Sequence, residues 1–231
     1  MTGVPVIAID GPGGSGKGTV ARRVAQALGW HLLDSGALYR LVGLAGARAG
    51  LAPGDEAGHA AAAAAMQVVF GSTAAGEESI RLEGDDVTAS IRSERAGNLA
   101  SQVASFPAVR AALSGRQRRF AVPPGLVADG RDMGSVIFPG AGLKIFLTAT
   151  PEERARRRYK QLKDKGLGVN LADLSREIAE RDHRDTTRAV APLVAAADAI
   201  LLDSTDLTPD QVVARVLALA RERFAGGGLR A

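Results

Sequence analysis

The chain has 231 residues, a formal net charge of +4, 46% hydrophobic residues and 23% charged residues. It contains no cysteine, which excludes disulfide bonds and thiolate zinc sites. The first residues lack the basic and long apolar segments of a signal peptide, and no apolar run approaches the roughly 20 residues that span a bilayer. We therefore expect a cytoplasmic protein with one sizeable core and no membrane partner.

The basic charge balance fits either a nucleic acid or a small phosphate-rich substrate, because positioned arginines serve both. Aromatic residues make up only 4% of the chain, which leaves few platforms for stacked bases. A small phosphate-rich substrate is therefore the better interpretation. We expect no nucleic-acid partner and a monomeric protein.

Five short apolar runs predict strands that are buried on both faces of a parallel sheet. They are Val4–Ile9, His31–Asp34, Leu126–Asp129, Lys144–Thr148 and Ala199–Leu202. Helical patterns cover Lys17–Leu28, Leu38–Arg48, Val109–Phe120, Glu152–Lys165, Leu171–Arg181 and Pro209–Phe224. This alternation predicts an α/β fold of the P-loop NTPase type, an open five-stranded parallel sheet flanked by helices.

Residues 51–98 break this rhythm and predict a small inserted subdomain. Six alanines, Ala60–Ala65, favour a helix, since alanine has the highest helix propensity. Short strand patterns at Val68–Phe70 and Ser79–Leu82 precede a turn at Glu83–Asp86. We expect a core formed by residues 1–50 and 99–225, and a flexible tail at 226–231.

A glycine-rich segment, Gly11–Thr19 with the sequence GPGGSGKGT, lies between the first predicted strand and the first predicted helix. Glycines let consecutive backbone N–H groups converge on one anion, and the helix N-terminus adds its positive dipole. Lys17 can then reach the β- and γ-phosphates of a nucleoside triphosphate. A glycine-rich linker would not explain a lone lysine placed where a helix begins. The segment therefore predicts a nucleotide-binding loop.

The loop departs from the general pattern after its lysine. Gly18 stands where Ser or Thr is usual, and the hydroxyl comes one residue later at Thr19. This ending resembles the loop of nucleoside monophosphate kinases more than that of GTPases. We expect Thr19 to bond a phosphate, and Mg²⁺ to be held largely through water and a distant carboxylate.

Two more segments place polar residues directly after predicted strands, where ligands bind in open α/β sheets. Ser35 would open a helix with Arg40 in its first turns; a helix cap and a solvated arginine are the alternative. Asp129 ends a strand as the magnesium-proximal carboxylate of P-loop enzymes does, and Arg131 and Asp132 follow. An exposed Asp-Gly turn is the alternative there.

Basic residues are dense from position 154 to 165, where Asp164 is the single acid. Most such charges are solvated helix faces, but phosphoryl transfer needs several cations around the transferring group, and a mobile segment suits them. Gly166 and Gly168 would supply a hinge. We expect a short lid over residues 152–168.

The chain resembles the bacterial cytidylate kinases over essentially its whole length. The resemblance rests on the segments AIDGPGGSGKGT, HLLDSGALYR, ASQVASFPAVR, ADGRDMGSVIFP, KIFL, ERDHRDTTRAVAPL and LLDST, which occur in the family's order. The 51–98 insert likewise resembles the nucleoside-monophosphate-binding insert of these enzymes. The resemblance implies phosphoryl transfer from ATP, with Mg²⁺, to CMP or dCMP.

The resemblance also implies roles for individual residues. The ATP phosphates would be held by Gly11, Pro12, Gly13, Gly14, Ser15, Gly16, Lys17, Gly18 and Thr19. The CMP-binding residues would be Ser35, Arg40, Ser101, Arg110, Arg131, Asp132, Arg181, Asp185 and Arg188. The groups nearest the chemistry would be Lys17, Arg131, Arg157 and Arg158, with Arg157 or Arg158 closing over ATP from the lid.

Within that acceptor set, Ser101, Arg110 and Asp132 would read the cytosine edge, and Arg40 and Arg131 would bind the phosphate. Asp185 and Arg188 are three residues apart, which predicts neighbouring side chains on one helical face. The three histidines, His31, His59 and His183, have no metal-ligand spacing.

Two other functions stay open at the level of sequence. A small-metabolite P-loop kinase would phosphorylate an alcohol and would need a carboxylate base, for which Asp34 is available. A nucleotide-dependent binding module would not need arginines on the acceptor side.

Overall fold

The computed structural model describes residues 3–72, 78–164, 166 and 168–225. The chain divides into two compact units. Residues 35–116 form one unit, and the described residues before and after them form the other. The predicted flexible tail at 226–231 lies outside the described residues.

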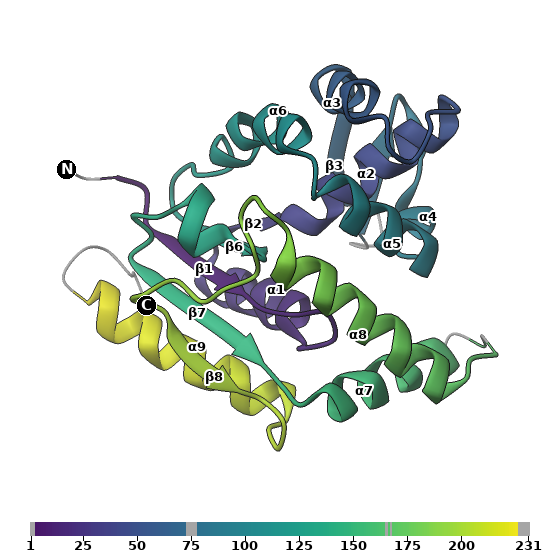
Figure 1. The fold of residues 1–231 in the computed structure, drawn as a ribbon. Helices are drawn as coiled ribbons and strands as arrows, with labels where there is room; N and C mark the ends of the chain where they lie inside the picture. The colour runs from purple at the N-terminus through teal and green to yellow at the C-terminus, as the bar shows by residue number, and fades with distance from the viewer. Residues whose placement is uncertain (1–2, 73–77, 165, 167, 226–231) are drawn as a thin grey trace. The chain divides into compact units, whose positions relative to one another are not determined.

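The first unit is built on a five-stranded parallel sheet with the strand order β2-β6-β1-β7-β8 (Figure 1). The strands are β1 Val6–Asp10, β2 His31–Asp34, β6 Leu126–Gly130, β7 Leu143–Thr148 and β8 Ile200–Asp203. This confirms the predicted fold class, and each observed strand lies within two residues of its predicted bounds.

The central strand β1 has all five residues buried, because it pairs with β6 on one side and β7 on the other. Helices α1 (Lys17–Leu28) and α9 (Pro209–Phe224) pack apolar residues against the sheet, including Val24 and Val216. Both helices have the predicted bounds. The carboxyl ends of the parallel strands therefore meet at one edge, where the glycine-rich loop leaves β1.

Three further elements of this unit follow strands β6 and β7 in the chain. They are η1 (Met133–Ile137), a single π-helical turn, α7 (Pro151–Asp164) and α8 (Leu171–Thr187). Helix α8 begins at the Asn170 cap, whose side chain accepts from the backbone N–H groups of Ala172 and Asp173. It runs six residues beyond the predicted end at Arg181, and η1 was not predicted from the sequence.

The second unit contains a three-stranded antiparallel sheet, β3 (Val68–Ser72), β4 (Glu78–Leu82) and β5 (Asp85–Asp86). Its helices are α2 (Ser35–Arg48), α3 (Glu56–Ala65), α4 (Thr88–Ile91), α5 (Glu94–Val103) and α6 (Pro107–Arg118), the last ending just past the unit. The structure thus confirms the predicted helix in the alanine run and the antiparallel pieces after it.

The second unit extends beyond the predicted 51–98 insert on both sides, since α2 and α5 pack tightly. A Cβ atom at Gly43 would lie 2.7 Å from the Cβ of Leu99, so only glycine permits this approach. That contact ties residues 35–50 to residues beyond 98. The role of the insert in binding a monophosphate stays a prediction.

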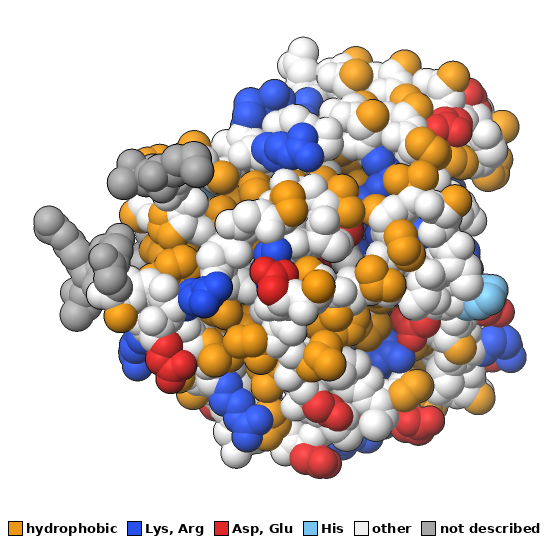
Figure 2. Space-filling model, turned by 60° about the vertical axis from the view of Figure 1, so that its left-hand side comes forward, with side chains coloured by type: hydrophobic (Ala, Val, Ile, Leu, Met, Phe, Trp, Pro, Cys, Tyr) orange, Lys and Arg blue, Asp and Glu red, His pale blue; other side chains and the backbone are white. Residues whose placement is uncertain are grey.

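Figure 2 shows lysine and arginine side chains in separate small groups among acidic and neutral ones on the face that it draws. On that face the basic charge is therefore dispersed rather than gathered into one stripe. None of the helices in the described part of the chain combines the length and apolar character needed to cross a membrane.

Candidate active site

The glycine-rich loop Gly11–Thr19 connects β1 to α1, and its glycines are required by its shape. Gly11 has a φ of +153°, and a Cβ atom there would lie 2.0 Å from the carbonyl oxygen of Leu147. Gly14 and Gly16 have φ values of +78° and +88°, in the left-handed region that favours glycine. The loop therefore packs its backbone directly on β7 while leaving Gly14 and Gly16 exposed.

Lys17 is half-buried at the start of α1, and its Nζ donates to the carbonyl oxygen of Pro12 at 3.0 Å. Burial and the neighbouring Arg131 lower the pKa of Lys17, while the nearby carboxylate of Asp129 opposes this shift. Arg131 and Arg181 repel the charge of Lys17, and the carboxylates of Asp129 and Asp185 offset part of that repulsion. A bound phosphate would relieve that repulsion and restore the lysine's affinity for its proton.

Asp129 lies at the carboxyl end of β6 and is buried. Burial raises the pKa of Asp129, opposed chiefly by Lys17. Its Oδ1 has no hydrogen-bond partner among the described residues, and a Cβ atom at Gly18 would lie 3.2 Å from its Oδ2. Glycine rather than a hydroxyl residue at position 18 thus leaves room beside this carboxylate.

A buried carboxylate oxygen without a partner fits a Mg²⁺ ion, which binds through one or two carboxylates, waters and substrate phosphates. Within the described residues, no three His, Asp or Glu side chains gather into a group that could hold a metal alone. Asp129 is therefore suited to a shared ion whose other ligands come from the nucleotide and from water.

Arginine–carboxylate pairs surround this edge of the first unit. Arg131 Nε donates to Asp185 Oδ2 at 2.9 Å, and Arg181 Nε lies 3.9 Å from the same oxygen. Burial disfavours the charge of Asp185, but Arg131 and Arg181 outweigh it and hold the pKa of Asp185 below its usual value. A Cβ atom at Gly13 would lie 3.8 Å from Arg131 Nη2. Arg131 thus points its far end at the phosphate loop.

Arg188 and Asp132 form a second pair, with Arg188 Nη2 at 3.9 Å from Asp132 Oδ1 and both side chains buried. The prediction that Asp185 and Arg188 share one helical face is wrong in its geometry. Helix α8 ends at Thr187, and Arg188 is the extended residue after it. Its Nε donates to the carbonyl oxygen of Ala191 instead.

The remaining predicted acceptor residues, Ser35, Arg40, Ser101 and Arg110, belong to the second unit. Ser35 begins α2, Ser101 lies on α5, and both are buried. Arg40 Nη1 donates to the carbonyl oxygens of Ile91 and Ser93, at 2.7 and 3.1 Å.

Arg110 of α6 is buried, with its guanidinium 5.6 Å from the ring centre of Tyr39 on α2. Its Nη1 also donates to the carbonyl oxygen of Ala104. These contacts fix the direction of the Arg110 fork inside the second unit.

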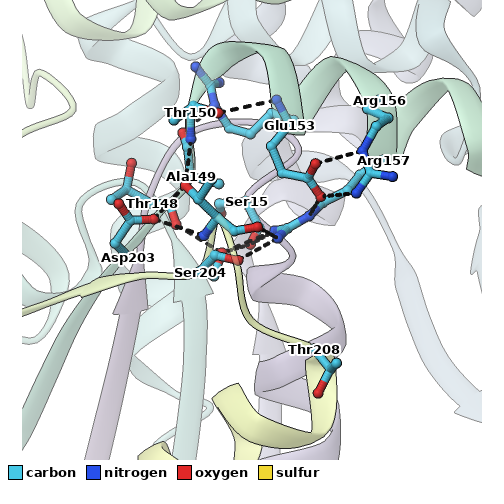
Figure 3. A network of polar contacts seen from close by, with 12 residues as sticks. Ser15, Thr148, Ala149, Thr150, Glu153, Arg156, Arg157, Asp203, Ser204 and Thr208 are labelled. Carbon is cyan, nitrogen blue, oxygen red and sulfur yellow. Dashed lines mark hydrogen bonds and ion pairs between the residues drawn. The ribbon is translucent and has the colours of Figure 1, made fainter.

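The predicted lid corresponds to α7 and the start of the segment after it, where Gly166 has a φ of +74°. Arg158 is half-buried on this helix, and burial lowers its pKa against the attraction of Glu177 on α8. Arg157 does not extend away from the core as a closing lid residue would. It reaches the carbonyl oxygens of Ser15 and Ser204 (Figure 3). It also donates to the carbonyl oxygen of Thr205.

Asp10, the last residue of β1, is a site residue that the sequence analysis missed. Its Oδ1 and Oδ2 accept the backbone N–H groups of Met133 and Gly134, each at 2.8 Å. These are the first two residues of η1, so Asp10 fixes the turn that follows Arg131 and Asp132. The signal was present, since a strand that ends in aspartate was the reason for singling out Asp129.

A phosphate loop on the central strand, a half-buried lysine and oriented arginines together define a P-loop kinase. A family model described as cytidylate kinase matches residues 7–222. The chain belongs to the cytidylate kinase family.

The sequence of the chain is similar to those of curated cytidylate kinases over nearly their whole length. The chain is 60% identical over 215 residues to the cytidylate kinase of Pseudomonas fluorescens strain Pf-5, covering 93% of this chain and 94% of the relative. It is 58% identical over 223 residues to that of Azotobacter vinelandii, covering 96% and 97%. With the enzyme of Klebsiella pneumoniae strain 342 the identity is 54% over 222 residues, covering 96% and 97%.

Asp10 gives a prediction about stability and pH. Burial raises the pKa of Asp10 from 3.8 to about 6, although two backbone N–H groups favour its charged form. The folded state therefore binds the proton of the Asp10 carboxyl more tightly than the unfolded state does. The contribution of Asp10 to the free energy of unfolding is greatest below pH 4. We expect that contribution to the free energy of unfolding to fall by on the order of 2–3 kcal/mol between pH 4 and pH 7.

Urea unfolding of the wild type and of Asp10→Asn across this pH range measures the effect. The difference between the two stability curves should change with pH in that direction and become constant above pH 7. A difference that stays constant from pH 4 to pH 7 would show that the pKa of Asp10 is not raised.

Ser15 gives a second prediction. Its side chain is buried, and its Oγ has no hydrogen-bond partner among the described residues. Removing an unsatisfied buried hydroxyl is close to neutral, so Ser15→Ala should keep the stability within about 1 kcal/mol and the turnover within about twofold. Thermal unfolding and steady-state kinetics check both values. A tenfold fall in turnover would mean that the hydroxyl itself contacts the nucleotide.

Proposed function

We propose that the chain transfers the γ-phosphoryl group of ATP to CMP or dCMP, giving ADP and CDP or dCDP. The observation that carries this proposal is the loop Gly11–Thr19 with Lys17 at its end, facing arginines held by Asp185. The chain is a nucleoside monophosphate kinase of the cytidylate kinase family. The particular roles of its residues are part of the proposal.

The loop residues Gly11 to Thr19 bind the ATP phosphates in this proposal. Exposed backbone N–H groups and the N-terminus of α1 meet the β- and γ-phosphates, and Lys17 balances the charge that they bring. The lowered pKa of Lys17 fits this role, because burial and the neighbouring Arg131 disfavour its charge and a bound phosphate would favour it. Thr19, exposed on the first turn of α1, adds a hydroxyl donor.

Asp129, acting through water, would hold Mg²⁺ together with the nucleotide. The ion would supply positive charge to the β- and γ-phosphate oxygens when bound. The residues of the chain orient the reactants around it. Lys17 favours the ionised form of Asp129 against the effect of burial, and Arg131 directs its Nη2 at the loop.

The residues predicted to bind the acceptor nucleotide have the following roles in this proposal. Arg40, Arg131, Arg181 and Arg188 would bind its phosphate, and Asp185 its sugar. Ser35, Ser101, Arg110 and Asp132 would contact the nucleoside, the last three through the cytosine edge. The burial of Ser101, Arg110 and Asp132 supports base reading, because buried polar groups discriminate by the hydrogen bonds that a wrong base leaves unmade.

The chemical step needs no general base in this mechanism, because the attacking group is already an anionic phosphate oxygen. Catalysis is then positioning together with charge stabilisation. Arg158 on α7 is the proposed cation that closes over ATP, and closure would exclude water that would otherwise hydrolyse it. A coupled assay with ATP and CMP, dCMP, UMP, AMP, GMP or shikimate tests the acceptor. Fastest turnover with shikimate would refute the proposal and favour an alcohol-directed kinase.

Lys17→Ala should abolish kinase activity while leaving the fold intact. Loss of one phosphate-directed cation from a water-poor site costs about 10²–10³-fold in turnover. Coupled kinetics with saturating ATP and CMP measure the loss, and circular dichroism checks the fold. Turnover within tenfold of the wild type would contradict this role for Lys17.

Asp132→Ala should weaken selection of cytosine more than it weakens binding of ATP. Asp132 is buried and faces Arg188, so it can accept from an exocyclic amino group that uracil lacks. We expect the ratio of kcat/KM for CMP to that for UMP to fall by about tenfold or more. If that ratio is unchanged in the variant, Asp132 does not read the base.

A further inference from the structure

The back of the phosphate loop is held by side-chain cations. Lys17 Nζ donates to the carbonyl oxygen of Pro12, and Arg154 Nη1 donates to that of Gly13, both at 3.0 Å. Arg157 Nη1 and Ser204 Oγ lie 3.3 Å from the carbonyl oxygen of Ser15. Three loop carbonyl groups therefore have partners on the protein side.

This arrangement sets the direction of the loop N–H groups. In a planar trans peptide, the C=O of one residue and the N–H of the next point in opposite directions. Anchoring the Ser15 carbonyl to the protein therefore turns the Gly16 N–H outward. Ser15 is buried and Gly16 is exposed, as this geometry requires.

Ser204 is the buried centre of the network in Figure 3. Its N–H and its Oγ both lie 2.8 Å from the carbonyl oxygen of Thr148, the last residue of β7. Arg157 Nη1 donates to Ser204 Oγ at 3.0 Å, and Arg157 Nη2 donates to the Ser204 carbonyl oxygen at 2.5 Å. A hydroxyl has one proton, so Arg157 supplies the donor for Ser15 when Ser204 serves Thr148.

The neighbours of Ser204 keep this turn in place. Asp203 Oδ1 accepts from the backbone N–H and the hydroxyl of Thr205. Thr205 Oγ1 in turn accepts the backbone N–H of Thr150 at 3.1 Å. The segment Asp203–Thr205 begins at the last residue of β8 and has no role in the mechanism proposed for the nucleotides.

Arg157 uses all of its donors within the protein. A guanidinium group has five N–H donors, and Arg157 makes five hydrogen bonds, to Ser15, Ser204, Thr205 and Glu153. Its neighbour Arg156 bonds the same Glu153 but has a side chain that is 74% exposed. The two adjacent arginines thus differ in whether they touch the phosphate loop.

We propose that Arg157 and Ser204 are positioning residues for the ATP phosphates, acting through the Ser15–Gly16 peptide. They hold the Ser15 carbonyl away from the nucleotide so that the Gly16 N–H faces it. A charged donor on that carbonyl also polarises the peptide and strengthens its N–H as an anion donor. The inference rests on the proposed function, since it takes the loop ligand to be ATP.

Steady-state kinetics of Arg157→Gln, Ser204→Ala and the double variant test the proposal, with Arg156→Gln as the matched control. We expect the KM for ATP to rise about tenfold in Arg157→Gln and about threefold in Ser204→Ala, with the KM for CMP nearly unchanged. The double variant should be no worse than Arg157→Gln alone, because both residues act on one peptide group. Arg156→Gln should match the wild type.

Arg157→Lys separates this role from direct contact with ATP. A lysine keeps the charge but cannot reproduce the planar fork that bonds Ser15, Ser204 and Glu153 together. Positioning therefore predicts that lysine fails to rescue the KM for ATP. The proposal would be overturned if Arg157→Lys restored the KM for ATP, if Ser204→Ala left that KM unchanged, and if the two substitutions acted independently in the double variant. Those results would instead assign Arg157 to a lid that contacts ATP directly.

An NMR measurement supplies a readout that loss of stability would not move. ATP should shift the Gly16 amide proton strongly downfield in the wild type and in Arg156→Gln, and much less in Arg157→Gln at saturating ATP. An equal shift in all folded variants would refute the proposal. Failure of the wild type to phosphorylate CMP would refute the proposed function instead, and the amide shift would still test the positioning role with ATP alone.

Discussion

The site depends on one constraint, which is that a short loop must turn several N–H groups toward a polyanion at the same time. The carbonyl groups of those peptides must then face the protein and find donors there. Gly11 and Gly14 let the loop backbone approach β7 and α7 closely enough for this. Arg154 and Lys17 donate to the carbonyl oxygens of Gly13 and Pro12. The cations of the site thus serve the protein backbone as well as the substrate.

The clustering of cations at this site also explains why carboxylates lie beside the loop that we propose binds phosphate. Lys17, Arg131 and Arg181 crowd together and repel one another, and burial makes that repulsion stronger. Asp129 and Asp185 compensate part of the positive charge before any nucleotide binds. Asp185 has the further effect of fixing the direction of two arginines. Such pairs reduce the side-chain ordering that remains to be done when substrates arrive.

Elements with strong local signals could be predicted from the sequence. Helix α1 ends where Gly29 adopts a left-handed conformation, and α9 begins with a capping box between Thr208 and Gln211. Both helices therefore have the predicted bounds. Helix α5 was missed, although Ser93 accepts from the N–H of Ala96 as an N-cap does. Its buried face consists mostly of small residues, Ala96, Gly97, Ala100 and Ser101, which do not stand out as core residues until the face is seen packed against α2.

The residues of the candidate site likewise divide into those with a local sequence signal and those without one. Gly11–Thr19 was predictable because its chemistry is local, with strand, glycines and lysine following one another in the chain. Asp10, in contrast, acts on Met133 and Gly134, which are more than a hundred residues away. Ser204 acts on Ser15 across a similar separation. No sequence periodicity encodes such contacts, because they exist only once β6, β1, β7 and β8 stand in this order in the sheet.

Arg131 shows how the two levels combine. It follows β6, so the sheet delivers it to the same edge as the phosphate loop on the neighbouring β1. Its Nε is held by Asp185 from α8, while Nη2 lies beside Gly13 of the loop. A guanidinium group whose Nε is held by a hydrogen bond can rotate very little, so its Nη groups point in one direction. The sheet order thus places the cation, and the ion pair decides where it points, before either nucleotide contributes any binding energy.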